Sequence, residues 1–94
     1  MRKNRKRFAE KINKLLEIPK EISGVESKIT ILGFDEMLIE NYKGISEYEE
    51  HYMKINTAMG IINITGIGME LEQITDEDAF VRGQIETIDI ERLE

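Results

Sequence analysis

Apolar residues near the start of the chain recur with the spacing of an α-helix. They would form one stripe along such a helix: Phe8, Ile12, Leu15 and Leu16. Basic residues fill most of the remaining positions, so the sequence predicts an amphipathic helix over residues 4–17. Pro19 ends it, because proline disfavours the helical conformation of the residue before it and has no backbone N–H to donate. Residues 18–24 then form a connector.

From Val25 onward the period of the hydrophobic pattern changes to two, which is typical of β-strands. The alternation predicts strands over these ranges: 27–32, 37–41, 45–48, 52–57, 61–65, 69–73 and 80–90. Residues 42–44, between the second and third of them, are predicted to form a turn. The connections between them are short, and short connections favour antiparallel neighbours. The expected fold is therefore mainly β, a small antiparallel meander or roll, preceded by one N-terminal amphipathic α-helix. Residues 1–20 form a helical head, and residues 21–94 form the all-β domain.

Isoleucine supplies most of the expected core. The chain has sixteen isoleucines, fourteen of them after Lys20, and β-branched side chains suit a pleated, half-buried surface. Nine are predicted to be core residues: Ile29, Ile31, Ile39, Ile45, Ile55, Ile62, Ile64, Ile88 and Ile90. In the last strand the apolar residues Val81 and Ile85 occupy odd-numbered positions, whereas Ile88 and Ile90 occupy even-numbered ones and would point to the opposite face. This slip predicts a bulge or turn within residues 83–87, and residues 66–68 are predicted to form a bulge or bend.

Charge divides the chain sharply. The head carries eight basic and two acidic side chains, a net charge of +6, whereas residues 21–94 carry five basic and seventeen acidic ones, a net charge of −12. An acidic body repels phosphate backbones, so we expect no nucleic acid on the β domain, and any anionic partner must meet the head. The candidate residues for a partner or an anionic membrane surface are Arg2, Lys3, Arg5, Lys6, Arg7, Phe8, Lys11, Ile12, Lys14 and Leu15. The alternative, that the apolar stripe packs on the sheet, stays open.

Residues that could carry chemistry are few. His51, the one histidine, is next to acidic residues without a ligand set or a nucleophile, and the pair Glu70 and Glu72 matches a solvated sheet face. There is no cysteine, so neither a disulfide nor a thiolate metal site is expected. We predict one domain with no catalytic residues, no metal and no cofactor. No apolar run approaches the length of a spanning helix, and no signal peptide is expected.

Short stretches spread along nearly the whole chain carry a family resemblance. They are, in order, Leu15-Leu16-Glu17-Ile18-Pro19-Lys20, Ile29-Thr30-Ile31-Leu32-Gly33, Leu38 through Ile45, Ile55-Asn56-Thr57 through Gly60, Ile64 through Gly68, Thr75 through Asp78, and Gly83-Gln84-Ile85. This ordered set resembles the YabP/YqfC family of small sporulation proteins, and within it the YqfC type. The chain departs from the family pattern where a proline is expected before the first strand, since Glu26-Ser27-Lys28 stands there.

The resemblance implies a protein of an endospore-forming bacterium, made in the cytoplasm of the mother cell. Such a protein would be a non-enzymatic adaptor or structural factor in forespore envelope assembly, that is, of spore cortex and spore coat. A membrane-protein partner and a peripheral place at the forespore outer membrane are implied with it. The alternative function is a ligand- or nucleic-acid-binding regulatory module that uses the basic head. We also expect a homodimer, because one small sheet cannot hide both its faces and its edges.

Overall fold

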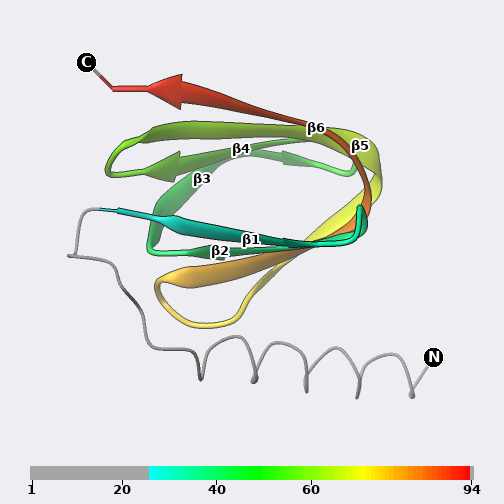
Figure 1. The fold of residues 1–94 in the computed structure, drawn as a ribbon, viewed down its shortest axis with the longest axis horizontal. Helices are drawn as coiled ribbons and strands as arrows, with labels where there is room; N and C mark the ends of the chain where they lie inside the picture. Colours follow the sequence, from blue (N-terminus) through cyan, green and yellow to red (C-terminus); the bar gives the residue numbers. More distant parts are fainter. Residues whose placement is uncertain (1–25, 94) are drawn as a thin grey trace.

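The computed structural model describes residues 26–93, which form one antiparallel sheet of six strands (Figure 1). The strands are β1 (Lys28–Leu32), β2 (Glu36–Glu40), β3 (Tyr42–Glu49), β4 (Tyr52–Thr57), β5 (Gly60–Gln73) and β6 (Asp78–Arg92). The predicted mainly β, antiparallel fold is thereby confirmed. The predicted N-terminal helix and head lie outside the described residues. Within residues 26–93 we find no helix with the length and apolarity needed to cross a membrane.

The strands follow the order β1-β2-β6-β5-β4-β3, so the sheet is a roll and not a meander. β2 and β3 are neighbours in sequence but do not pair, because β6 lies between β2 and β5. The long β5 and β6 curve together and fold the sheet over itself (Figure 1). The first layer holds β1, β2, residues 78–82 of β6 and the end of β5. The second layer holds the rest of β6, the start of β5, β4 and β3.

The bend of β5 and β6 depends on glycine and on an extra residue. Thr65 pairs with Thr87 but Gly66 pairs with Ile85, so β6 is bulged at position 86 and the predicted slip within residues 83–87 is confirmed. Gly83 has a φ of 142°, and a Cβ there would lie 2.6 Å from Cα of Met69 across the bend. Only glycine fits such a close, positive-φ site. A second register shift between residues 67 and 70 of β5 confirms the predicted irregularity around residues 66–68.

One predicted turn is wrong. Residues 42–44 were expected to reverse the chain, but Tyr42 already opens β3, and the reversal takes place at Asn41 alone, which has a φ of 62°. Asparagine tolerates this left-handed conformation better than most residues. Its side-chain amide donates a 2.8 Å hydrogen bond to the carbonyl oxygen of Glu26, which fixes the turn beside the entry to β1.

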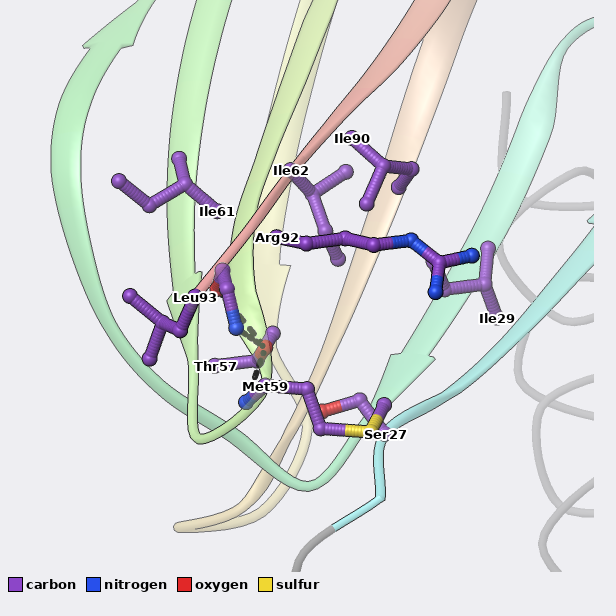
Figure 2. A pocket seen from close by; sticks show the side chains of 10 residues that line it. Ser27, Ile29, Thr57, Met59, Ile61, Ile62, Ile90, Arg92 and Leu93 are labelled. Atoms are coloured by element: carbon purple, nitrogen blue, oxygen red, sulfur yellow. Dashed lines mark hydrogen bonds between the residues drawn. The ribbon is translucent and has the colours of Figure 1, made fainter.

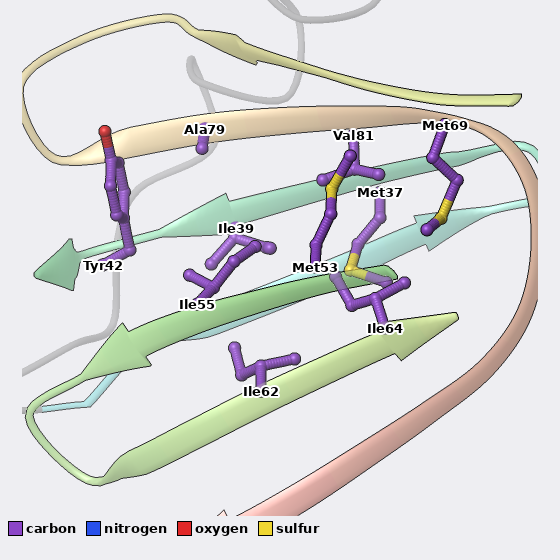
Figure 3. Packing of buried hydrophobic residues seen from close by; sticks show 10 residues of the cluster. All are labelled: Met37, Ile39, Tyr42, Met53, Ile55, Ile62, Ile64, Met69, Ala79 and Val81. Atoms are coloured by element: carbon purple, nitrogen blue, oxygen red, sulfur yellow. The ribbon is translucent and has the colours of Figure 1, made fainter. Parts of the chain in front are cut away.

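The core lies between the two layers (Figure 3). Its buried members are Met37, Ile39, Tyr42, Met53, Ile55, Ile62, Ile64, Met69, Ala79 and Val81, with Ile29, Leu71, Ile85 and Ile88 packed against them. Three isoleucines predicted to be core residues are exposed instead: Ile31 by 49%, Ile45 by 37% and Ile90 by 51%. Each occupies a position whose side chain points to the inner face of the sheet. Each nevertheless belongs to a strand segment at the margin of its layer, where the opposite layer no longer covers it.

Candidate interaction site

One side of the roll is open, where β1 of the first layer faces residues 86–92 of β6 in the second. In the described part of the chain, β1 pairs with β2 alone and residues 86–92 pair with β5 alone. Two strand edges therefore border the same opening, which we name the seam. Unpaired edges present backbone N–H and C=O groups and are natural sites for association with another strand.

The seam contains a pocket of about 300 Å³ (Figure 2). Its lining comes from both layers: Ser27, Ile29, Thr57, Met59, Gly60, Ile61, Ile62, Ile90, Arg92 and Leu93. Among these described lining residues Arg92 is the one with a charged side chain, and Figure 2 shows it extending toward Ile29. The site is therefore an apolar hollow beside a guanidinium, which can hold an apolar side chain and donate to a carbonyl or carboxylate oxygen.

A network of hydrogen bonds fixes the β4–β5 turn at the mouth of the pocket. The Thr57 hydroxyl donates to the carbonyl oxygen of Gly60 at 2.8 Å and accepts from the backbone N–H groups of Met59 (3.2 Å) and Gly60 (3.1 Å). The N–H of Leu93 donates to the carbonyl oxygen of Met59 at 3.0 Å, which ties the end of the described chain to this turn. Met59, Ile90 and Leu93 consequently stay in place as exposed apolar side chains.

The two hydroxyl groups of the lining are used structurally. Ser27 donates its hydroxyl proton to the carbonyl oxygen of Asn41 at 2.7 Å, and Thr57 is engaged in the turn. No histidine or acidic residue is among the described lining residues. The described lining offers apolar contact surface and the Arg92 guanidinium, which suit binding by contact.

The opposite side of the roll is bridged. The hydroxyl of Tyr48 on β3 accepts a 3.0 Å hydrogen bond from the backbone N–H of Leu71 on β5. Nearby, the N–H of Met69 donates to the carbonyl oxygen of Glu50 at 2.7 Å, and that of Gly66 to His51 at 3.1 Å. These bonds connect the two layers where β3 meets the end of β5. On the seam side the N–H groups of Gly83 and Ile85 donate 3.0 Å bonds to the carbonyl oxygens of Asp35 and Phe34, so the β1–β2 turn closes the seam at the bend. Beyond the bend, in the described part of the chain, β1 and residues 86–92 of β6 do not pair, and the pocket lies there.

The residues singled out from the sequence are placed as follows. The basic and apolar head residues lie outside the described range. His51 lies exposed in the β3–β4 turn, with its Nε2 atom 3.1 Å from the carboxylate of Glu49, and exposed pairs of this kind contribute little to stability. Glu70 and Glu72 are exposed on the first layer, and Glu70 contacts Arg82 at 3.3 Å. Within residues 26–93 no three His, Cys, Asp or Glu side chains converge to hold a metal ion.

The pocket was not predicted from the sequence. Ile29, Ile62 and Ile90 were all assigned to the core, and the sequence contains no sign that Ile90 lies at an open margin. One usable sign was present, since Leu93 is an apolar residue that lies beyond the last predicted strand and outside the alternation of Ile88 and Ile90. An apolar residue after the end of the expected core is a reasonable candidate for a contact residue.

Comparison with known families gives one clear result. The model of the YabP family matches residues 23–93, which include all six strands and the whole described lining of the pocket. The head, residues 1–20, precedes the matched region. A search of curated proteins and a search of solved structures found no match. Because the family model covers well over half of its length, the chain belongs to the YabP family.

Proposed function

We propose that this chain is a non-enzymatic adaptor or structural protein of forespore envelope assembly, acting through protein–protein contacts. Membership of the YabP family is consistent with a sporulation-related role. The observation that carries the contact function is the seam, where two strand edges that pair with no further strand of residues 26–93 border an apolar pocket with Arg92 at its side. Exposed isoleucines beside free edges fit a protein surface better than a small polar substrate.

We assign the occupant of the seam to a second copy of this chain. The two edges are strands of the same molecule, so a two-fold related copy can present the matching edges in return. Burial of Ile31, Ile90 and Leu93 would remove the apolar surface that a monomer leaves exposed. A homodimer joined in this way would be the unit that meets other envelope components.

The finer parts of the proposal come from the resemblance to the YqfC type. They place the chain in the mother-cell cytoplasm, at the surface of the forespore outer membrane, with a membrane protein as partner in cortex and coat assembly. The net charge of +6 on the head supports a position near an anionic surface, because basic residues are attracted to anionic lipid. The regulatory alternative requires binding that weakens steeply with salt and depends on the head alone.

Deletion of the gene in its spore-forming host tests the function. We expect fewer heat-resistant spores and a defective cortex or coat by electron microscopy, both restored by the unaltered gene. Complementation with Ile90→Lys should fail, because a charged side chain would replace an apolar contact residue of the seam. Complementation with Ile67→Lys should succeed, because Ile67 is also an exposed isoleucine but lies outside the pocket lining. Immunoblots must show equal amounts of both variants.

Two results would contradict the proposal. Normal spores after deletion would remove the role in envelope assembly. Full complementation by Ile90→Lys, with a deletion defect present, would leave the sporulation role and remove the seam as its contact site.

A further inference from the structure

The centre of the outer face of the first layer is closed to solvent, at Leu38 and Phe80, although it points away from the core. Leu38 of β2 and Phe80 of β6 stand opposite each other in register, and each is only 1% exposed. Their neighbours along the two strands, such as Met37 and Val81, point into the core between the layers. Leu38 and Phe80 therefore point outward, and β2 and the start of β6 are buried on both faces.

The six strands do not supply a cover for this outer face. Every described strand belongs to one of the two layers, and the second layer covers the inner face alone. Thr30 and Glu72 flank Leu38 and Phe80 across the sheet, but neighbours on one pleated surface stand side by side and leave side-chain tips open. The cover must therefore come from outside residues 26–93.

The surroundings of the apolar pair carry more acidic than basic side chains, because Lys28 opposite Glu40 and Arg82 opposite Glu36 are the bases of this face within residues 26–93. Glu36 and Glu40 share the outward parity of Leu38 on β2, and Asp78 stands opposite Glu40 on β6. Glu40 and Asp78 are themselves nearly buried, at 2% and 3% exposure. An apolar centre with carboxylates around it complements a helix that carries an apolar stripe and basic flanks.

We propose that this face is the docking site of the chain's own head. The stripe of Phe8, Ile12 and Leu15 would contact Leu38 and Phe80, and the basic side chains of the head would meet the acidic surround. The head carries a net charge of +6, and the residues between it and β1 can reach across roughly 20 Å when extended. The inference goes beyond the proposed function, because it gives the stripe an intramolecular partner and makes docking compete with any membrane contact.

Thiol protection tests the docking, because the chain has no cysteine of its own. Leu38→Cys in the full chain places one reporter thiol on the outer face, and Ile67→Cys gives an exposed reference. Reaction with a water-soluble disulfide reagent should be at least about tenfold slower at position 38, since a buried thiol reacts only during local opening. Adding Ile12→Asp and Leu15→Asp to the head should remove this protection. Lys14→Asp alone should leave it in place.

The other outcomes identify the alternatives. A thiol at position 38 that reacts as fast as the reference overturns the inference. So does protection that survives the two substitutions in the head while circular dichroism shows a folded sheet. Protection that fades on dilution points to a second copy as the cover, and protection that needs vesicles of anionic lipid points to the membrane. Either of these would remove intramolecular docking without touching the role proposed for the seam.

Discussion

Neighbouring side chains on β4 show how strongly the fold separates its two faces. Ile55 is fully buried between the layers, whereas Lys54 lies half-buried on the outer face of the second layer, opposite Asn63. We expect Ile55→Asp to unfold the domain and Lys54→Asp to leave it folded. An unpaired buried carboxylate costs several kcal/mol, comparable with the whole stability of a small domain. Thermal unfolding followed by circular dichroism compares the two variants. Equally mild effects would show that the assignment of Ile55 to the core face of β4 is wrong.

Glycine at position 83 is required by the bend of β6. We expect Gly83→Ala to lower the free energy of unfolding by about 2–4 kcal/mol, from a strained positive φ and a clash with the backbone of Met69. Gly44→Ala is the matched control, because a Cβ there meets nothing closer than the Asn56 side chain at 4.0 Å. Urea unfolding measures both variants, and a Gly83→Ala protein as stable as Gly44→Ala would contradict this account of the bend.

At the scale of elements, Asp78 organises the connection between β5 and β6. Its carboxylate accepts hydrogen bonds from the backbone N–H of Asn41 (3.3 Å) and the hydroxyl of Thr75 (2.9 Å). Its carbonyl oxygen accepts from the N–H of Ile74 at 2.9 Å and of Thr75 at 3.2 Å. One residue thus joins the loop to the Asn41 reversal, which lies far away in sequence.

Removal of that carboxylate should loosen both turns. We expect Asp78→Ala to cost about 1–3 kcal/mol of stability, because the Asn41 N–H and the Thr75 hydroxyl lose their acceptor. Asp76→Ala is the control, since it removes the same charge from an exposed position of the same loop. Chemical denaturation of the two variants gives the difference. Equal stabilities would show that the backbone bonds alone hold this connection.

The hydrophobic pattern predicted the strands well where apolar and polar residues alternate without a break. The range 52–57 was predicted to the residue, and the phase slip of the last strand was located correctly at residues 83–87. The turn predicted over residues 42–44 was wrong, because a reversal at one asparagine leaves no run of turn residues to detect. Residues 61–65 and 69–73 were expected as two strands, whereas the curved β5 runs through both.

Strand pairing and side-chain exposure depend on segments that are distant in sequence, so the local hydrophobic pattern did not predict them. No local sequence feature indicates that β6 pairs between β2 and β5, because the strand order depends on packing between segments far apart in sequence. For the same reason the sequence predicted which face of the sheet Ile31 and Ile90 occupy, but not that they are exposed, and it did not predict the pocket that Ile90 lines. The candidate residues of the head lie outside the described range, so the predictions on them stand as predictions.

At the scale of the whole molecule, charge of opposite sign is divided between the head and the sheet. We expect the full chain to sediment with vesicles of anionic lipid and not with neutral ones. Each basic residue near such a surface contributes about 1 kcal/mol, and a short apolar stripe makes the binding reversible. Docking on Leu38 and Phe80 would keep it weak. Replacing Lys3, Lys6 and Lys11 by Glu should abolish it, and equal, negligible binding to both vesicles would exclude direct lipid contact.

Self-association is the last property that the whole molecule should show. We expect a homodimer formed by the β domain, because the seam leaves Ile31, Ile90 and Leu93 exposed beside two strand edges. The charge of −12 on residues 21–94 opposes association, but at physiological salt the screening length is about 8 Å, so only close acidic pairs matter. The dimer should therefore weaken at low salt.

Light scattering on the full chain measures the dimer directly. Ile90→Lys should shift the population to monomer, because two like charges would meet across the two-fold axis, and Ile67→Lys, outside the seam, should not. Residues 21–94 should still form the dimer, since the head takes no part in the seam. A monomer of the full chain at tens of micromolar would contradict the expectation. A dimer insensitive to Ile90→Lys but lost with the head would instead place the contact on the outer face around Leu38 and Phe80.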